Sequence, residues 1–101
     1  MNVQVDLCVI PIGIGISIAP YGAVCQKVLD EANLSFTLHA CGTNIEGDWN
    51  DVFAALRRCH EVIHNMKAPR ISTTIKMGTR TDRRQRLQDK VDAVLRLGDA
   101  T

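Results

Sequence analysis

The segment His60-Glu61-Val62-Ile63-His64 has the H-E-x-x-H spacing of zinc hydrolases. On a helix, both histidines would lie on one face and could share a zinc ion, with Glu61 as general base. A catalytic zinc needs a third protein ligand. No H-x-x-G-x-x-H extension and no glutamate follows Glu61, and the best remaining ligand, Asp82, is not fixed near the helix by any pattern. We therefore expect no metal site and no catalytic residues, and a zinc hydrolase is only a third alternative.

A second pattern, Gly13-Ile14-Gly15, stands between a predicted strand and a predicted helix, as glycines do in dinucleotide-binding folds. The third glycine of that motif would fall at Ile18, and no parallel β-α-β unit follows. The free backbone amides of a helix start and the hydroxyl of Ser17 could still hold a polar ligand group. A flexible turn explains the glycines equally well, so both interpretations stay open.

Four arginines, Arg80, Arg83, Arg84 and Arg86, lie near the predicted start of the third helix. The helix macrodipole disfavours cations at that end, so Asp82, another subunit or a phosphate could compensate them. RNA binding through the expected sheet would need exposed aromatic side chains. The chain has one Trp, one Tyr and two Phe. We therefore favour a solvated or interface charge cluster over nucleic-acid binding.

The length of 101 residues suits a single domain over residues 1–101. A charged fraction of 23% and a net charge of +1 argue against a dedicated nucleic-acid or membrane-surface binder. The longest apolar stretch, Leu7 to Ile18, is too short to span a bilayer and has no basic segment before it. We expect a cytoplasmic protein.

The cysteines form no C-x-x-C pair and stand at Cys8, Cys25, Cys41 and Cys59. A disulfide framework would need a secreted context, which nothing in the sequence indicates. We interpret them as buried or half-buried thiols rather than redox or metal groups.

The elements follow from hydrophobic periodicity, which alternates in strands and repeats every 3.6 residues in helices. Strands are predicted over 2–10, 34–41, 43–46 and 70–77, and helices over 17–32, 49–66 and 82–97. Ser17 and Asp48 are expected N-caps, and Gly98 the end of the last helix. The order β-α-β-β-α-β-α predicts an α+β fold. This is a ferredoxin-like βαββαβ sandwich, with two helices on one face of a four-stranded antiparallel sheet and an additional C-terminal helix.

The uncovered sheet face would carry mostly small or uncharged side chains, and it could meet solvent, a ligand or another subunit. We expect it to present Gln4, Asp6, Cys8, Ser35, Thr37, His39, Cys41, Asn44 or Glu46, Ser72, Thr74 and Lys76. The third helix also has an apolar stripe that needs a surface to cover. It could fold back on its own sheet, or it could build an oligomer with the open face.

Three segments, CVIPIGIGISIAPY, GTNIEGDW and RISTTIKMGTRTD, resemble in order and spacing the small thiamine-binding (YkoF-like) protein family. The similarity extends from residue 3 to about residue 95, and the G-T-x-I-E-G element is its most specific part. The resemblance implies a ferredoxin-like domain that assembles into dimers and tetramers. Some members bind thiamine or its hydroxymethylpyrimidine half without known catalysis, and others have no assigned ligand.

The residues are compatible with such a ligand, which needs polar partners for an aminopyrimidine and apolar walls for its faces. The candidate binding residues are Ser17, Thr43, Asn44 and Glu46 for polar contacts and Ile12, Ile14 and Trp49 for the walls. A thiazolium cation could be met by Glu46 or by the ring of Trp49. Hairpin-turn chemistry explains Thr43 and Asn44 equally well.

The expected function is that of a non-enzymatic binding protein for thiamine or its hydroxymethylpyrimidine moiety, working as a homodimer or homotetramer without a cofactor. The second hypothesis is an oligomeric ligand-sensing or structural module with a different small-molecule ligand. Both hypotheses exclude nucleic-acid and membrane partners.

Overall fold

A computed structural model of the chain describes residues 1–15 and 17–99. The strands are β1 (Asn2–Ile12), β2 (Ser35–His39), β3 (Gly42–Asp48) and β4 (Arg70–Thr79). The helices are α1 (Ala19–Glu31), α2 (Trp49–Asn65) and α3 (Leu87–Asp99). Ile16 of the glycine loop and the last two residues of the predicted 1–101 domain lie outside the described residues.

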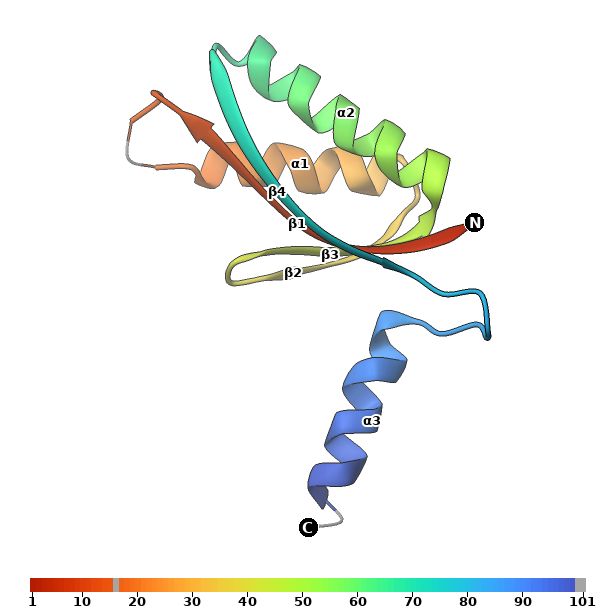
Figure 1. The fold of residues 1–101 in the computed structure, drawn as a ribbon. Helices are drawn as coiled ribbons and strands as arrows, with labels where there is room; N and C mark the ends of the chain where they lie inside the picture. The colour runs from red at the N-terminus through yellow and green to blue at the C-terminus, as the bar shows by residue number, and fades with distance from the viewer. Residues whose placement is uncertain (16, 100–101) are drawn as a thin grey trace.

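The four strands form one antiparallel sheet in the order β2-β3-β1-β4. Helices α1 and α2 lie together on one face of it, as Figure 1 shows. This arrangement confirms the predicted ferredoxin-like α+β sandwich. In the register of β1, Gln4 lies between Glu46 of β3 and Gly78 of β4, so these three residues share the open face.

The core lies between the sheet and the two helices, where alternation along the strands brings every second side chain. Val3 and Val5 of β1 and Ile45 of β3 are buried against Val52 of α2 and Leu29 of α1. A second buried cluster joins α1 and α2 through Cys25, Val28, Cys59, Ile63 and Ala68. Thus α1 and α2 cover one face only, and the opposite face stays free for other contacts.

Strand β1 continues two residues past its predicted end, through Pro11 to Ile12. A proline lacks the N–H that a central strand needs, so it is tolerated where one edge of the strand is unpaired. Strand β3 pairs with β1 only as far as Leu7, whereas β4 continues to Ile12. Pro11 therefore lies where only β4 flanks the strand.

The two predicted N-caps have different outcomes. The Asp48 carboxylate accepts the Asn50 N–H at 3.1 Å and caps α2, as expected. The prediction for Ser17 is wrong, because Ile18 occupies the N-cap position of α1 and no side chain caps this helix. The first helical carbonyl is that of Ile18, which accepts the N–H of Tyr21, so Ser17 lies one residue too early.

Helix α3 begins at Leu87, five residues later than predicted, and includes Gly98 instead of ending there. It projects away from the open face of the sheet, on the side opposite α1 and α2 (Figure 1). Its apolar stripe is exposed, with Val94 at 69% and Leu97 at 71% of full accessibility. None of the helices in the described ranges has the length and apolar composition needed to cross a bilayer.

Candidate functional site

A cleft of about 840 Å³ opens between the free sheet face and the segment that leads into α3. Its floor comes from strand residues such as Gln4, Glu46 and Gly78, and its wall from the loop between β4 and α3. The lining consists of Asn2, Gln4, Ser35, Glu46, Gly47, Gly78, Thr79, Arg80, Thr81, Arg83, Arg84, Gln85, Arg86 and Lys90. Most of these side chains are polar or cationic.

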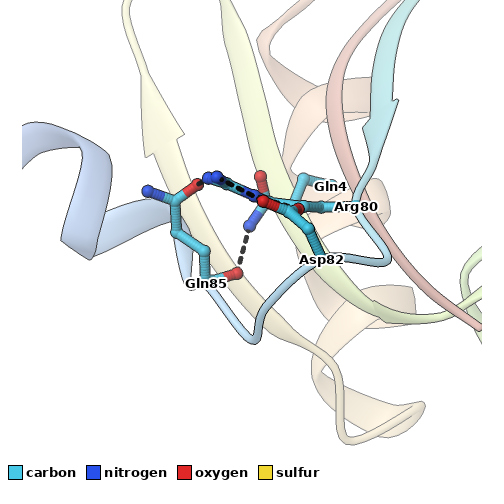
Figure 2. Close-up of polar contacts among 4 residues, drawn as sticks. All are labelled: Gln4, Arg80, Asp82 and Gln85. Atoms are coloured by element: carbon cyan, nitrogen blue, oxygen red, sulfur yellow. Dashed lines mark hydrogen bonds and ion pairs between the residues drawn. The ribbon is translucent and has the colours of Figure 1, made fainter.

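Hydrogen bonds hold the wall of the cleft against its floor (Figure 2). The Gln4 amide donates from Nε2 to the carbonyl oxygen of Gln85 at 2.7 Å, which ties the loop to β1. Arg80 donates from Nη1 to Oε1 of Gln85 at 2.8 Å, and from Nε and Nη2 to both oxygens of Asp82, at 2.5 and 2.9 Å. This two-pronged pairing lowers the pKa of Asp82 to about 2. The loop is therefore an ordered wall of the cleft.

Glu46 connects the sheet to the start of α3. Its side chain is 12% exposed, and Oε2 accepts the backbone N–H of Leu87 at 3.1 Å. Its other oxygen, Oε1, accepts from Nε of Arg86 at 3.4 Å. A carboxylate at a helix start is favourable, because the first amides there have no partner within the helix. The Asp89 carboxylate accepts the next amide outward, that of Arg86, at 2.8 Å.

The cleft has a strong positive charge. Arg80 and Arg86 each have a carboxylate partner, in Asp82 and Glu46 respectively. The remaining cations of the lining, Arg83, Arg84 and Lys90, have no carboxylate within ion-pair distance in the described part of the chain. Glu46 is the one carboxylate among the described lining residues. A ligand in this cleft therefore meets excess positive charge at the rim and Glu46 at the floor.

The predicted hairpin residues lie on opposite faces of the sheet. Asn44 and Glu46 are on the open face, about 7 Å apart at the spacing of alternate strand residues. Thr43 points to the helix side, is 7% exposed, and accepts a hydrogen bond from Gln26 of α1 at 2.9 Å. Thr43 thus packs between the sheet and α1, and its contact with a ligand stays a prediction.

Trp49 lies at the start of α2 and packs on Phe53, with ring centroids 4.8 Å apart, at the edge of the core. The other predicted residues, Ile12, Ile14 and Ser17, lie at and beyond the far end of β1. Eight residues of strand separate Ile12 from the position opposite Glu46, about 26 Å at 3.3 Å per residue. A single chain does not bring the seven predicted residues together.

The histidines of the H-E-x-x-H segment have structural partners. Nε2 of His60 lies 2.6 Å from the Thr73 hydroxyl of β4, and Nδ1 of His64 lies 2.8 Å from the carbonyl oxygen of Ala68. Their ring centroids are 6.3 Å apart. Within residues 1–15 and 17–99, no three His, Cys, Asp or Glu side chains are grouped so that they could hold a metal ion.

The cysteines are free thiols in three settings, and the expectation of a buried or half-buried thiol is wrong for Cys41. Cys25 and Cys59 are buried between α1 and α2, Cys8 is half-buried, and Cys41 is exposed. Interaction with Cys25 and burial raise the pKa of the Cys59 thiol, so this thiol stays protonated at neutral pH. The buried pair therefore behaves as core packing.

The sequence placed Gln4 on the open face, but it gave no sign that Gln85 would lie over it and form the wall of a cleft. The available signal was the basic run from Arg80 to Arg86, which indicated an anionic partner without placing the run over the sheet. Nothing local connects Gln4 with Gln85 or Glu46 with Leu87, because these contacts join residues 81 and 41 positions apart.

Comparison with known proteins gives one consistent family. Residues 5–95 match the family described as thiamine-binding protein. The chain is 58% identical over 94 residues to UPF0045 protein sll0230 of Synechocystis sp., covering 93% of this chain and 78% of that protein. It is 39% identical over 95 residues to UPF0045 protein ECM15 of Eremothecium gossypii, covering 93% and 90% of the two chains.

Solved structures share the fold. The crystal structure of hypothetical protein MJ1052 of Methanocaldococcus jannaschii superposes with a TM-score of 0.85 at 26% identity, over 92% of this chain and 95% of that one. A protein of Thermotoga maritima, described as a candidate thiamine biosynthesis/salvage protein, gives a TM-score of 0.79 at 12% identity. That alignment covers 93% of this chain and 99% of the other.

Proposed function

The chain belongs to the thiamine-binding protein family, and we propose that it binds thiamine or its hydroxymethylpyrimidine moiety, without catalysis, as a homo-oligomer. The observation that carries this proposal is the cleft on the open sheet face, together with the family match over residues 5–95. The volume of about 840 Å³ is within the range of roughly 300–1,000 Å³ that small-molecule sites occupy. The description of the Thermotoga maritima protein is in line with this choice of ligand.

The floor of the cleft suits an aminopyrimidine. The ring needs an acceptor for its exocyclic amine and donors or acceptors for its nitrogens. Glu46 supplies carboxylate oxygens, Gln4 and Asn2 supply amides, and Ser35 supplies a hydroxyl, all on one face of the sheet. Asn44 lies next to this group on β3. We therefore assign the polar contacts to the Glu46 end of the sheet.

A second subunit is part of the proposal because the predicted binding residues form two groups. The Asn44 and Glu46 group lies about 26 Å along the strand from Ile12, with Ile14 and Ser17 beyond it. A thiamine-sized ligand does not span that distance. A site that contains both groups needs one subunit to supply the polar floor and another to supply the apolar wall.

Two exposed apolar surfaces of the chain fit a second copy of it. Helix α3 presents Val94 and Leu97 to solvent, and the open sheet face presents Ile10 and Ile12 near the end of β1, each 38% exposed. Neither surface is covered by α1 or α2, which lie on the opposite face (Figure 1). Two identical chains that exchange α3 would cover both surfaces at once, as a two-fold symmetric interface requires.

The binding proposal is tested by calorimetric titration of the full chain with thiamine and with hydroxymethylpyrimidine. We expect saturable binding at micromolar affinity or better, weakened about tenfold or more by Glu46→Gln. Arg86→Gln controls for the loss of the Glu46–Arg86 pair while the carboxylate remains, and Glu31→Gln, on the helix side, controls for charge. No heat up to millimolar ligand would contradict the proposal and favour the module with a different ligand. Unchanged affinity in Glu46→Gln would remove Glu46 from the site.

Absence of catalysis and a cytoplasmic location remain predictions. Incubation of the protein with thiamine under the binding conditions is expected to return thiamine unchanged by mass. A time-dependent product that disappears in Glu46→Gln would contradict the non-enzymatic proposal.

A further inference from the structure

We infer that the cleft prefers a phosphate ester of its ligand, with the phosphoryl group held at the rim by Arg83, Arg84 and Lys90. This inference rests on the proposed function, because it concerns the chemical form of the same ligand. The starting observation is the charge of the lining, in which Arg83, Arg84 and Lys90 have no carboxylate within ion-pair distance among the described residues. Arg83 acts on Asp82 only through its charge, which helps to lower the pKa of that carboxyl.

The charge of free thiamine fits this lining poorly. Its thiazolium ring is a cation, and its single attraction in the cleft is Glu46, which already accepts from Leu87 and Arg86. A phosphate monoester carries about −1.5 to −2 charges at pH 7 and offers three strong acceptor oxygens. The ester reverses the sign of the interaction with the rim, so phosphorylation turns repulsion into attraction.

The types of the cations also fit a phosphoryl group. The guanidinium of arginine is planar and pairs with phosphate through two parallel hydrogen bonds, while lysine adds a point charge. Arg83 and Arg84 are adjacent in the loop, and Lys90 lies one turn into α3, all on the lining of the same cleft. Arg80 is held by Asp82 and Gln85, so it positions the loop and leaves its neighbours available.

The position of the charges matches the shape of such a ligand. The neutral polar groups Asn2, Gln4 and Ser35 lie with Glu46 on the strands, whereas the three cations without an ion-pair partner belong to the loop and α3. A pyrimidine on the floor would leave its phosphorylated end at the solvent-facing rim, where a doubly charged group keeps part of its hydration. The neutral polar groups thus belong to the strands, and the unpaired cations belong to the loop and α3.

Nucleic acid is a poorer match for the same arginines. Single-stranded nucleic acid binds through aromatic side chains that stack on bases as well as through cations. No aromatic residue is among the described residues that line the cleft, and Trp49 and Phe53 pack against the core. The net charge of the whole chain is +1. The cluster therefore suits one phosphoryl group better than a phosphate backbone.

The test is a calorimetric comparison of thiamine, thiamine monophosphate and inorganic pyrophosphate on the full chain. We expect the monophosphate to bind at least tenfold more tightly than thiamine at low salt. The double variant Arg83→Gln with Arg84→Gln is expected to weaken binding of the monophosphate and so to abolish that preference. The matched control is Arg57→Gln with Arg58→Gln, two exposed arginines on α2, which should keep the preference. Circular dichroism of each variant verifies folding.

Several outcomes overturn the inference while the proposed function stands. These are equal or tighter binding of thiamine, or a preference for the monophosphate that survives the Arg83 and Arg84 double variant. Tighter binding of a 12-nucleotide uridine RNA than of the monophosphate would also overturn it. If neither of the thiamine compounds nor hydroxymethylpyrimidine binds, the proposed function fails. In that case, pyrophosphate binding that is lost in the double variant would still support an anion site at Arg83 and Arg84. A lack of pyrophosphate binding would rule out the anion site too.

Discussion

Removing the Glu46 carboxylate should loosen the start of α3 by an amount that hydrogen exchange can measure. The perturbation is Glu46→Ala, which deletes the acceptor of the Leu87 amide and the partner of Arg86. A hydrogen bond to a charged group contributes about 1.5–3 kcal/mol, and a carboxylate near a helix start about 0.3–1 kcal/mol. The Arg86 side chain is 68% exposed, so this ion pair adds about 0–1 kcal/mol.

These contributions overlap, and water can reach the open cleft to replace part of what is lost. The lower end of the hydrogen-bond range, about 1.5 kcal/mol, is therefore the appropriate value for the variant. Since about 1.4 kcal/mol corresponds to a factor of ten, the Leu87 amide should exchange about tenfold faster. Glu46→Gln keeps an acceptor without the charge, so its effect should be smaller.

The assay is amide hydrogen exchange of the wild type and both variants, resolved at the first turn of α3. Amides in β1 and α2 should be unchanged, because Glu46 lies on the open face, away from the buried core. Glu31→Ala serves as control on the opposite side of the sheet. Unchanged protection of Leu87 in Glu46→Ala would refute the idea that the sheet anchors α3 through this carboxylate.

Three further predictions concern assembly, acid stability and packing. Val94→Glu with Leu97→Glu places two charges on the exposed stripe of α3, at the proposed contact between subunits. The sedimentation coefficient should fall to that of a smaller species, and an unchanged coefficient would exclude that contact. Asp82 has a pKa of about 2 in the folded chain, below the unfolded value of about 3.9. Its ionised form therefore stabilises the fold above about pH 4, and this contribution is lost as the pH falls towards 2. In urea unfolding, the stability of Asp82→Asn should depend less on pH over that interval than the stability of the wild type. Ile63→Ala, at a fully buried position between α1 and α2, should lower the free energy of unfolding by about 2–5 kcal/mol, and a loss below 1 kcal/mol in urea titration would contradict the assigned packing.

The local parts of the fold could be predicted because their causes lie within a few residues. Alternation of Val3, Val5 and Leu7 identifies the buried face of β1, and Asp48 caps α2 through an amide two residues away. Alternation along β3 places Asn44 and Glu46 on the open face and Thr43 on the helix side. The prediction that all three residues line one site did not take this alternation into account.

The features that could not be predicted depend on contacts between residues distant in sequence. The end of β1 beyond Pro11 depends on where β3 stops pairing. The start of α3 depends on Glu46, which accepts the amide of Leu87. The wall of the cleft is tied to the sheet by the Gln4–Gln85 and Glu46–Leu87 hydrogen bonds. None of these contacts changes the periodicity of the sequence around it. The sequence therefore shows a basic run from Arg80 to Arg86 but gives no sign that this run lies over the open face of the sheet.

The most direct test of the ligand site is a two-dimensional NMR titration of the labelled chain with thiamine monophosphate. We expect the largest amide shifts at Gln4, Glu46 and Gln85. We also expect the side-chain signals of Arg83 and Arg84 to shift with thiamine monophosphate and to stay unchanged in a parallel titration with thiamine. Shifts confined to the surroundings of His60 and His64 on α2, or no shifts at saturating ligand, would contradict this ligand site.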